Sequence, residues 1–214
     1  MRVSKYGFLI VLMALLAGCQ SAYYAAWEKV GIEKRDILVD RVEDARETQQ
    51  DAQQQFASAL EQFSTLINFD GGELQQVYEA LSDEFDASQS SADAVKKRID
   101  SVENVAEALF DEWQAELAKY SNINLRRDSE RQLKETQRNY STMIKAMRKV
   151  EKSMDPVLAA LQDNVLYLKH NLNANAVGAL QGELRTITRD VDALIKEMNA
   201  AIAQSDSFIK TIQG

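Results

Sequence analysis

Few side chains in this sequence could carry chemistry, and they are scattered. Cys19 is the only cysteine, so its thiol could accept a covalent group but can form no disulfide within the chain. His170 is the only histidine, and no candidate partners for a metal site or an acid–base pair cluster near it. Carboxylates such as Glu43 and Glu47 follow the spacing of a solvated helix face. We therefore expect no catalytic residue, no metal site and no cofactor.

Nucleotide-dependent chemistry also lacks a signal. The sequence contains neither the phosphate-loop pattern G-x-x-x-x-G-K-[ST] nor the dinucleotide pattern G-x-G-x-x-G. An ATPase needs a phosphate cradle and an acidic residue that holds its metal. Any similarity to the coiled-coil arms of DNA-repair or chromosome-maintenance ATPases would therefore reflect shared heptad composition.

The sharpest charged cluster is a basic run, which could bind phosphate, lipid headgroups or an acidic partner. It consists of Arg126, Arg127, Arg131, Lys134 and Arg138. The alternative is a solvated helix face turned toward the preceding acidic segment. Residues 71–118 hold 12 acidic and 3 basic side chains, whereas residues 119–152 hold 10 basic and 4 acidic ones. Because consecutive antiparallel helices would pair these stretches, the sequence favours the second interpretation.

The first residues have the composition of an export signal. Arg2 and Lys5 precede the apolar stretch 8–16, which is shorter than the roughly 20 residues that a membrane-spanning helix needs. The small residues Ala17 and Gly18 follow directly before Cys19. A positive start, a short apolar core and small residues together predict a signal peptide over residues 1–18.

The sequence LAGC at residues 16–19 resembles the bacterial lipobox. That resemblance implies that Cys19 receives lipid, that the peptide is cut just before it, and that acyl chains hold the mature chain on a membrane. Gln20 stands where an aspartate would favour inner-membrane retention, so the outer membrane, on its periplasmic face, is the expected location. An uncleaved N-terminal anchor and an ordinary secretory signal with a coincidental cysteine are the alternatives.

Three aromatic side chains follow the cysteine closely. Tyr23, Tyr24 and Trp27 could lie at the membrane interface, where aromatic rings with polar tips are enriched. They could equally form the first core layer of a helical bundle.

The mature chain, residues 19–214, is expected to be one helical domain. It has a single proline and six glycines, and it is rich in Ala, Gln, Glu, Lys and Leu. Apolar side chains recur in steps of three and four, which predicts helices over 22–68, 73–120, 125–171 and 175–212. Short turns between long helices predict an all-α, elongated antiparallel four-helix bundle or coiled coil.

Some features could interrupt these helices. Ser88 to Ser91 are polar, but the heptad register continues across them, so we expect a continuous helix with a polar layer. The register also continues across Pro156, which predicts a kink. Gly178 and Gly182 are four residues apart, a spacing that indicates tight packing near the last turn.

Two stretches and the lipobox together resemble a proteobacterial lipoprotein family catalogued only as a domain of unknown function. The stretches are YYAAWEKVGIEKRDILVDRVEDAR at 23–46 and DNVLYLKHNLNANAVGAL at 163–180. The resemblance covers the whole mature chain. It implies a coiled-coil lipoprotein and brings no known activity, cofactor or catalytic residue.

These observations favour a lipid-anchored, non-enzymatic scaffold, spacer or adaptor in the cell envelope. Its partners would be the membrane, through acyl chains on Cys19, an unknown envelope protein, or a second copy of the chain. A binder of a lipid or apolar ligand between the helices is the alternative. A nucleic-acid-associated coiled coil or an enzyme fits less well, because the chain carries a formal charge of −8 and has no catalytic motif.

Overall fold

The computed structural model describes residues 33–68 and 74–213 of the 214-residue chain. Within these ranges the chain forms α2 (Lys34–Ile67), α3 (Leu74–Glu116), the short 3₁₀ helix η1 (Leu117–Lys119), α4 (Ile123–His170) and α5 (Ala174–Gln213), and no strand. The predicted all-α fold is therefore confirmed. The part of the first predicted helix that precedes residue 33 lies outside the described ranges.

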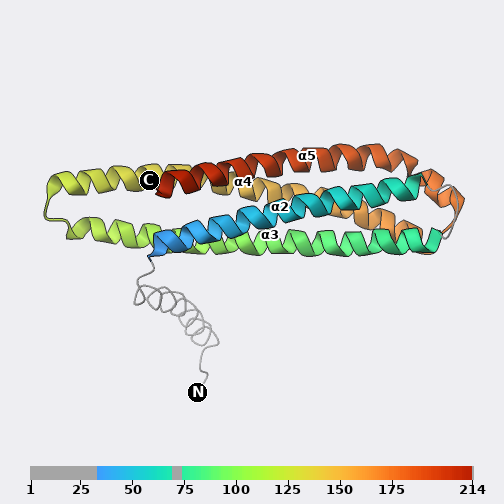
Figure 1. Ribbon diagram of the computed structural model, residues 1–214, viewed down its shortest axis with the longest axis horizontal. Helices are drawn as coiled ribbons and strands as arrows, with labels where there is room; N and C mark the ends of the chain where they lie inside the picture. The colour runs from blue at the N-terminus through green and yellow to red at the C-terminus, as the bar shows by residue number, and fades with distance from the viewer. Residues whose placement is uncertain (1–32, 69–73, 214) are drawn as a thin grey trace, which may run out of the picture.

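The four long helices form an elongated antiparallel bundle (Figure 1). α2 packs on α3 and α5, and α4 packs on the same two helices, so each helix has two main neighbours. Consecutive helices lie side by side and run in opposite directions (Figure 1). At 1.5 Å per residue, the 48 residues of α4 span about 72 Å.

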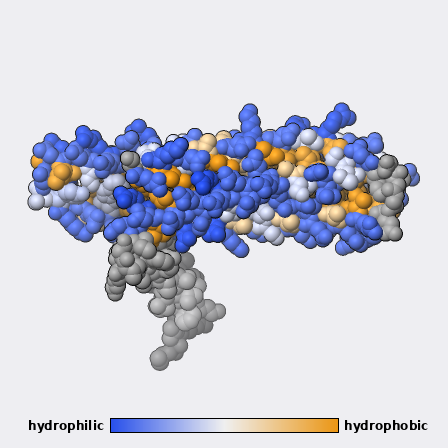
Figure 2. Space-filling view, in the orientation of Figure 1, coloured by the Kyte–Doolittle hydropathy of each residue, from blue (hydrophilic) through white to orange (hydrophobic). Residues whose placement is uncertain are grey.

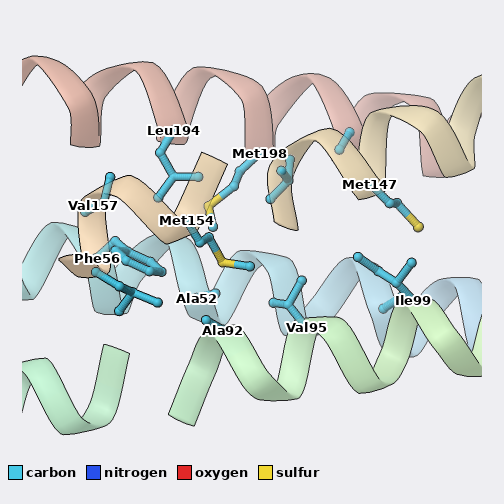
Figure 3. Close-up of a cluster of buried hydrophobic side chains, with 14 of the residues drawn as sticks. Ala52, Phe56, Ala92, Val95, Ile99, Met147, Met154, Val157, Leu194 and Met198 are labelled. Carbon is cyan, nitrogen blue, oxygen red and sulfur yellow. The ribbon is translucent and has the colours of Figure 1, made fainter. Parts of the chain in front are cut away.

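The heptad positions predicted from the sequence fill the interior of the bundle. Figure 3 shows side chains from all four helices pointing into one core, including Phe56, Val95, Met154 and Leu194. Met147, Met154 and Met198 are almost completely buried, so these unbranched side chains act as core filler. The helices are stabilised mainly by this shared apolar stripe, because propensity alone supports long helices weakly in water.

Asparagines begin two of the helices. The Asn122 side chain accepts hydrogen bonds from the backbone N–H groups of Asn124 and Leu125, and so caps α4. Asn173 accepts in the same way from Asn175 and Ala176 at the start of α5.

Neither the polar stretch at Ser88 nor Pro156 breaks its helix. The hydroxyl of Ser88 donates to the carbonyl of Glu84 at 2.8 Å, so this buried polar side chain is satisfied within α3. α4 continues through Pro156, with Met154 and Leu158 buried on either side. A bend at Pro156 stays a prediction.

The expectation of tight packing at the two glycines of α5 is wrong. Gly178 and Gly182 are exposed, and a Cβ atom built on either would meet no described atom within 4 Å. Their spacing matches a packing motif, but the helix turns this face away from its neighbours.

The helices differ in length, so the bundle has an uneven end. Lys34 Nζ, at the start of α2, lies 3.1 Å from Glu112 Oε1, before the end of α3. Gln132 lines one groove together with Ile212, near the end of α5. Residues 117–131, here called the α3–α4 arm, therefore extend past the start of α2 and the end of α5 (Figure 1).

Candidate interaction surface on the α3–α4 arm

The base of the arm is closed by a small set of contacts. Leu117 and Ser129 are buried, and the indole N–H of Trp113 donates to the Ser129 hydroxyl at 2.8 Å. Every side chain from residue 118 to residue 128 is exposed. The arm is therefore a well-anchored hairpin whose end has no packing partner in the described part of the chain.

Large apolar side chains lie at the end of the arm. Tyr120 is 41% exposed, and Ile123 and Leu125 are each 55% exposed. Figure 2 shows hydrophobic residues at this end of the molecule, surrounded by hydrophilic ones. The other exposed large apolar residues in the described ranges, Leu166 and Tyr167, lie near the opposite end of α4.

The predicted basic run begins on the arm and continues along α4. Arg131 pairs with Asp128, and Lys134 Nζ lies 2.7 Å from Glu130 Oε1. This hydrogen bond from Lys134 lowers the pKa of Glu130. Each pair joins two residues that are three or four positions apart on α4.

The other three members of the run remain without such pairs. Arg126, Arg127 and Arg138 form no ion pair or side-chain hydrogen bond within the described residues, and all three are exposed. No member of the run pairs with α3 in those ranges, and the expectation that these cations face the acidic segment stays a prediction. The predicted exposure of a solvated helix face is confirmed.

Arg148 makes the predicted contact between the acidic and basic helices. Its guanidinium donates to Asp100 at 2.6 Å and to Glu151 at 2.6 Å, and its Nε donates to Glu103 Oε1 at 3.1 Å. The carboxylate of Glu103 is the main cause of a raised Arg148 pKa, because it favours the charged guanidinium. This cluster was not predicted from the sequence. Several cations lie between residues 119 and 152, and the alignment of α3 along α4 decides that Arg148 is the one beside these carboxylates.

A half-buried tyrosine, Tyr140, lies beside this cluster. The Tyr140 ring packs edge-on against Phe110, with centroids 5.3 Å apart, and against Phe208 at 6.2 Å. Burial is the main cause of a raised Tyr140 pKa, and the nearby Glu103 adds to it. The phenol is thus held neutral in a packing role.

α4 and α5 are joined by a second polar group. Glu197 accepts a hydrogen bond from the Ser153 hydroxyl, and Lys149 Nζ lies 2.9 Å from its other carboxylate oxygen. The hydrogen bond from Ser153 is the main cause of a lowered Glu197 pKa. These two partners favour the charged carboxylate and link α4 to α5.

Gln49 is a buried polar side chain that the described residues leave without a hydrogen-bond partner. Gln49 on α2 is 0% exposed, and neither its amide nitrogen nor its amide oxygen has a hydrogen-bond partner among the described residues. The polar atoms of Gln49 therefore lie in an apolar interior at a cost to stability.

The grooves on the bundle surface are shallow and partly polar. A groove of about 620 Å³ between α2 and α5 is lined by Leu60, Glu61 and Leu184, among others. Two grooves of about 340 and 370 Å³ lie beside Trp113, next to Arg35 and other polar residues. None of these three grooves is an apolar channel between the helices.

Side chains of the types that bind metal ions do not cluster in the part of the chain that the structure describes. The described ranges contain no group of three or more His, Cys, Asp or Glu side chains that could hold a metal ion. His170 is exposed in the last turn of α4.

The remaining predicted sites lie outside the described residues. They are the lipidation site Cys19 and the aromatic residues Tyr23, Tyr24 and Trp27. No helix in the described ranges is both long and apolar enough to cross a membrane.

The comparison with protein families gives one match. The model of DUF2959, described as a protein of unknown function, matches residues 23–212. No curated protein matches the chain. The resemblance to an uncharacterised family is confirmed, whereas its lipoprotein character stays a prediction, and the match assigns no activity to any residue.

Proposed function

The chain belongs to the family DUF2959, and we propose that it is a lipid-anchored scaffold, spacer or adaptor of the cell envelope without catalytic activity. The observation that carries this proposal is the bundle itself: one continuous core surrounded by exposed helix faces about 72 Å long. Such a molecule can act through its length and its surface.

The proposed mechanism is geometric. Acyl chains on Cys19 fix one end of the chain, because each buried methylene contributes about 0.8 kcal/mol to membrane binding. The bundle then presents partner surfaces at distances of tens of ångströms from that point. The location that we propose, the periplasmic face of the outer membrane, is supported by the lipobox resemblance and by Gln20.

The alternative, an apolar ligand between the helices, draws no support from the core. It would be favoured by a wide apolar groove with Phe110 or Trp113 free to line it. Instead, Phe110 packs against Tyr140, and the two grooves beside Trp113 are lined mostly by polar residues.

Site-specific photo-crosslinking in cells tests the adaptor role. Probes at the exposed positions Lys97, Gln114 and Gln137 would report on α3 and α4, and a probe at Asp51 on α2 serves as a control on another helix. We expect one discrete envelope protein to be captured at neighbouring positions and not at the control. Adducts only to the chain itself would instead indicate a homo-oligomeric structural element.

The anchor is tested separately. Mass spectrometry of the N-terminal peptide should find Cys19 acylated and residues 1–18 removed, and Cys19→Ala should release the protein from the membrane fraction. An unmodified Cys19 in a chain that retains its first 18 residues would overturn the anchored location.

A further inference from the structure

We propose that the end of the α3–α4 arm is a contact site for an anionic lipid bilayer. Three features converge on this end: unpaired cations, exposed apolar side chains, and its position relative to the start of α2. The first two features stand on the described residues alone. The third rests on the proposed anchor at Cys19.

The cations of the arm are available to an external anion. Arg126 and Arg127 are exposed and form no ion pair in the described ranges. Residues 117–131 hold four basic and two acidic side chains, whereas the whole chain carries a formal charge of −8. An anionic surface would therefore attract the arm and repel the rest of the bundle, which orients the molecule end-on.

The exposed apolar residues of the arm lie beside its arginines, as is typical of a segment at a membrane interface. Tyr120, Ile123 and Leu125 are exposed within a few residues of Arg126 and Arg127. Apolar side chains flanked by arginines are typical of segments that lie at the boundary between headgroups and acyl chains. A tyrosine there can keep its hydroxyl in water while its ring lies among lipids.

The length of the chain before α2 places a bilayer within reach of the arm. Thirteen residues lie between Cys19 and Glu33, and an extended chain of that length spans at most about 50 Å. The first turns of α4, from Ile123 to Gln132, extend about 14 Å past the start of α2. A membrane that holds Cys19 is therefore close enough for the end of the arm to touch it.

The opposite end of the bundle lacks this combination. Leu166 and Tyr167 are exposed there, but α4 places a single cation, Lys169, within a few residues of them, and the start of α2 lies nearer the arm. Exposed apolar residues alone do not indicate a lipid contact, so we assign the bilayer site to the arm.

The test uses the full chain, purified from membranes, with Ser121→Cys labelled by an environment-sensitive dye. Ser121 is exposed in the turn before α4, and Cys19 is the only native thiol. The protein is reconstituted into phosphatidylcholine vesicles, with or without phosphatidylglycerol. We expect blue-shifted, stronger dye emission only with phosphatidylglycerol, and high salt should reverse it.

Matched charge reversals identify the residues responsible. Arg126→Glu with Arg127→Glu should abolish the phosphatidylglycerol response. Arg185→Glu with Arg189→Glu makes the same change in charge on exposed positions of α5 and should leave the response intact. Equal emission with both vesicle types, or equal loss in both double variants, would overturn the proposal.

If Cys19 is not acylated, the same experiment gives a different result. A chain without acyl groups would take up two dye molecules and would not float with phosphatidylcholine vesicles. Charge-dependent flotation of that chain with phosphatidylglycerol vesicles, lost in Arg126→Glu with Arg127→Glu, would still support the arm site. Absence of such flotation would contradict it.

Discussion

At the scale of single residues, Gln49 is the clearest conflict between a side chain and its surroundings. A buried amide without hydrogen-bond partners costs free energy relative to the solvated amide of the unfolded chain. Its position in the heptad pattern could be read from the sequence, but its lack of partners depends on which side chains the other helices bring near it.

We expect Gln49→Met to raise the free energy of unfolding by about 1–3 kcal/mol, because methionine has a similar shape and no polar group to desolvate. Urea denaturation followed by circular dichroism measures the change. Gln54→Met, at an exposed position of the same helix, should change stability little. A destabilised Gln49→Met variant would mean that the amide has a partner in solution.

Glu197 should make stability depend on pH. Its pKa is lowered in the fold, so the native state binds fewer protons than the unfolded chain near the ordinary glutamate pKa of about 4.3. Its contribution is present above that pH and is lost as the pH falls through the lowered value. The stability difference between wild type and Glu197→Gln should therefore narrow in acid.

Urea denaturation at neutral pH and below about pH 4 checks this expectation. Glu183→Gln, at an exposed position of α5, is the control and should show only a small difference at either pH. A gap for Glu197→Gln that widens in acid would contradict the assignment of Ser153 and Lys149 as its stabilising partners.

At the scale of elements, the position of each helix could be predicted from local sequence. The alignment of one helix along its neighbour could not. Steps of three and four between apolar residues predict each helix, since only neighbours in sequence are involved. The pairing of Arg148 with Asp100 and Glu103 depends on how far α3 is shifted along α4, which small differences in turn geometry decide. The basic run is a related case, since none of its members pairs with α3 in the described residues.

We expect Arg148→Met to lower the free energy of unfolding by about 1–2 kcal/mol, because it leaves three carboxylates near one another without their shared cation. A double-mutant cycle with Glu103→Gln should show a coupling energy between the two residues. Arg189→Met removes a cation that is 73% exposed and pairs only with the adjacent Asp190, so its effect should be small. Additive effects in the cycle would contradict the pairing.

Gly182→Ala should stabilise α5 by about 0.5–1 kcal/mol. Glycine is a poor residue in the interior of a helix, and the added methyl group would meet no described atom within 4 Å. Thermal unfolding measures the gain, with Gln181→Ala at the neighbouring exposed position as a control. A loss of stability would instead indicate that another part of the chain or a second copy packs on this face.

At the scale of the whole molecule, the bundle should behave as a rod. A rod about 72 Å long has a radius of gyration of about 22 Å, whereas a globular domain of about 200 residues has one near 16 Å. Small-angle X-ray scattering of residues 20–214, coupled to size-exclusion chromatography, measures this value for the monomer. A radius of gyration close to that of the globular domain would contradict the elongated bundle.

The arm shows where sequence reasoning reaches its limit. The turn near Ser121 and the cations that follow it could be predicted, since both are local features. Their exposure depends on α2 beginning level with Glu112 and on α5 ending near Gln132, and no short-range pattern encodes these alignments. The lipidation of Cys19 stays a prediction from the lipobox.

The packing of α2 against α5 also has a mechanical consequence. The start of α2 and the end of α5 lie at the same level of the bundle, next to each other (Figure 1). A load applied between these two points would peel α2 from α5 one layer at a time, beginning near the Arg46–Asp206 pair. A load applied between the start of α2 and the distant α4–α5 turn would instead shear many core layers at once. The bundle should therefore resist tension along its axis far better than tension that pulls α2 away from α5.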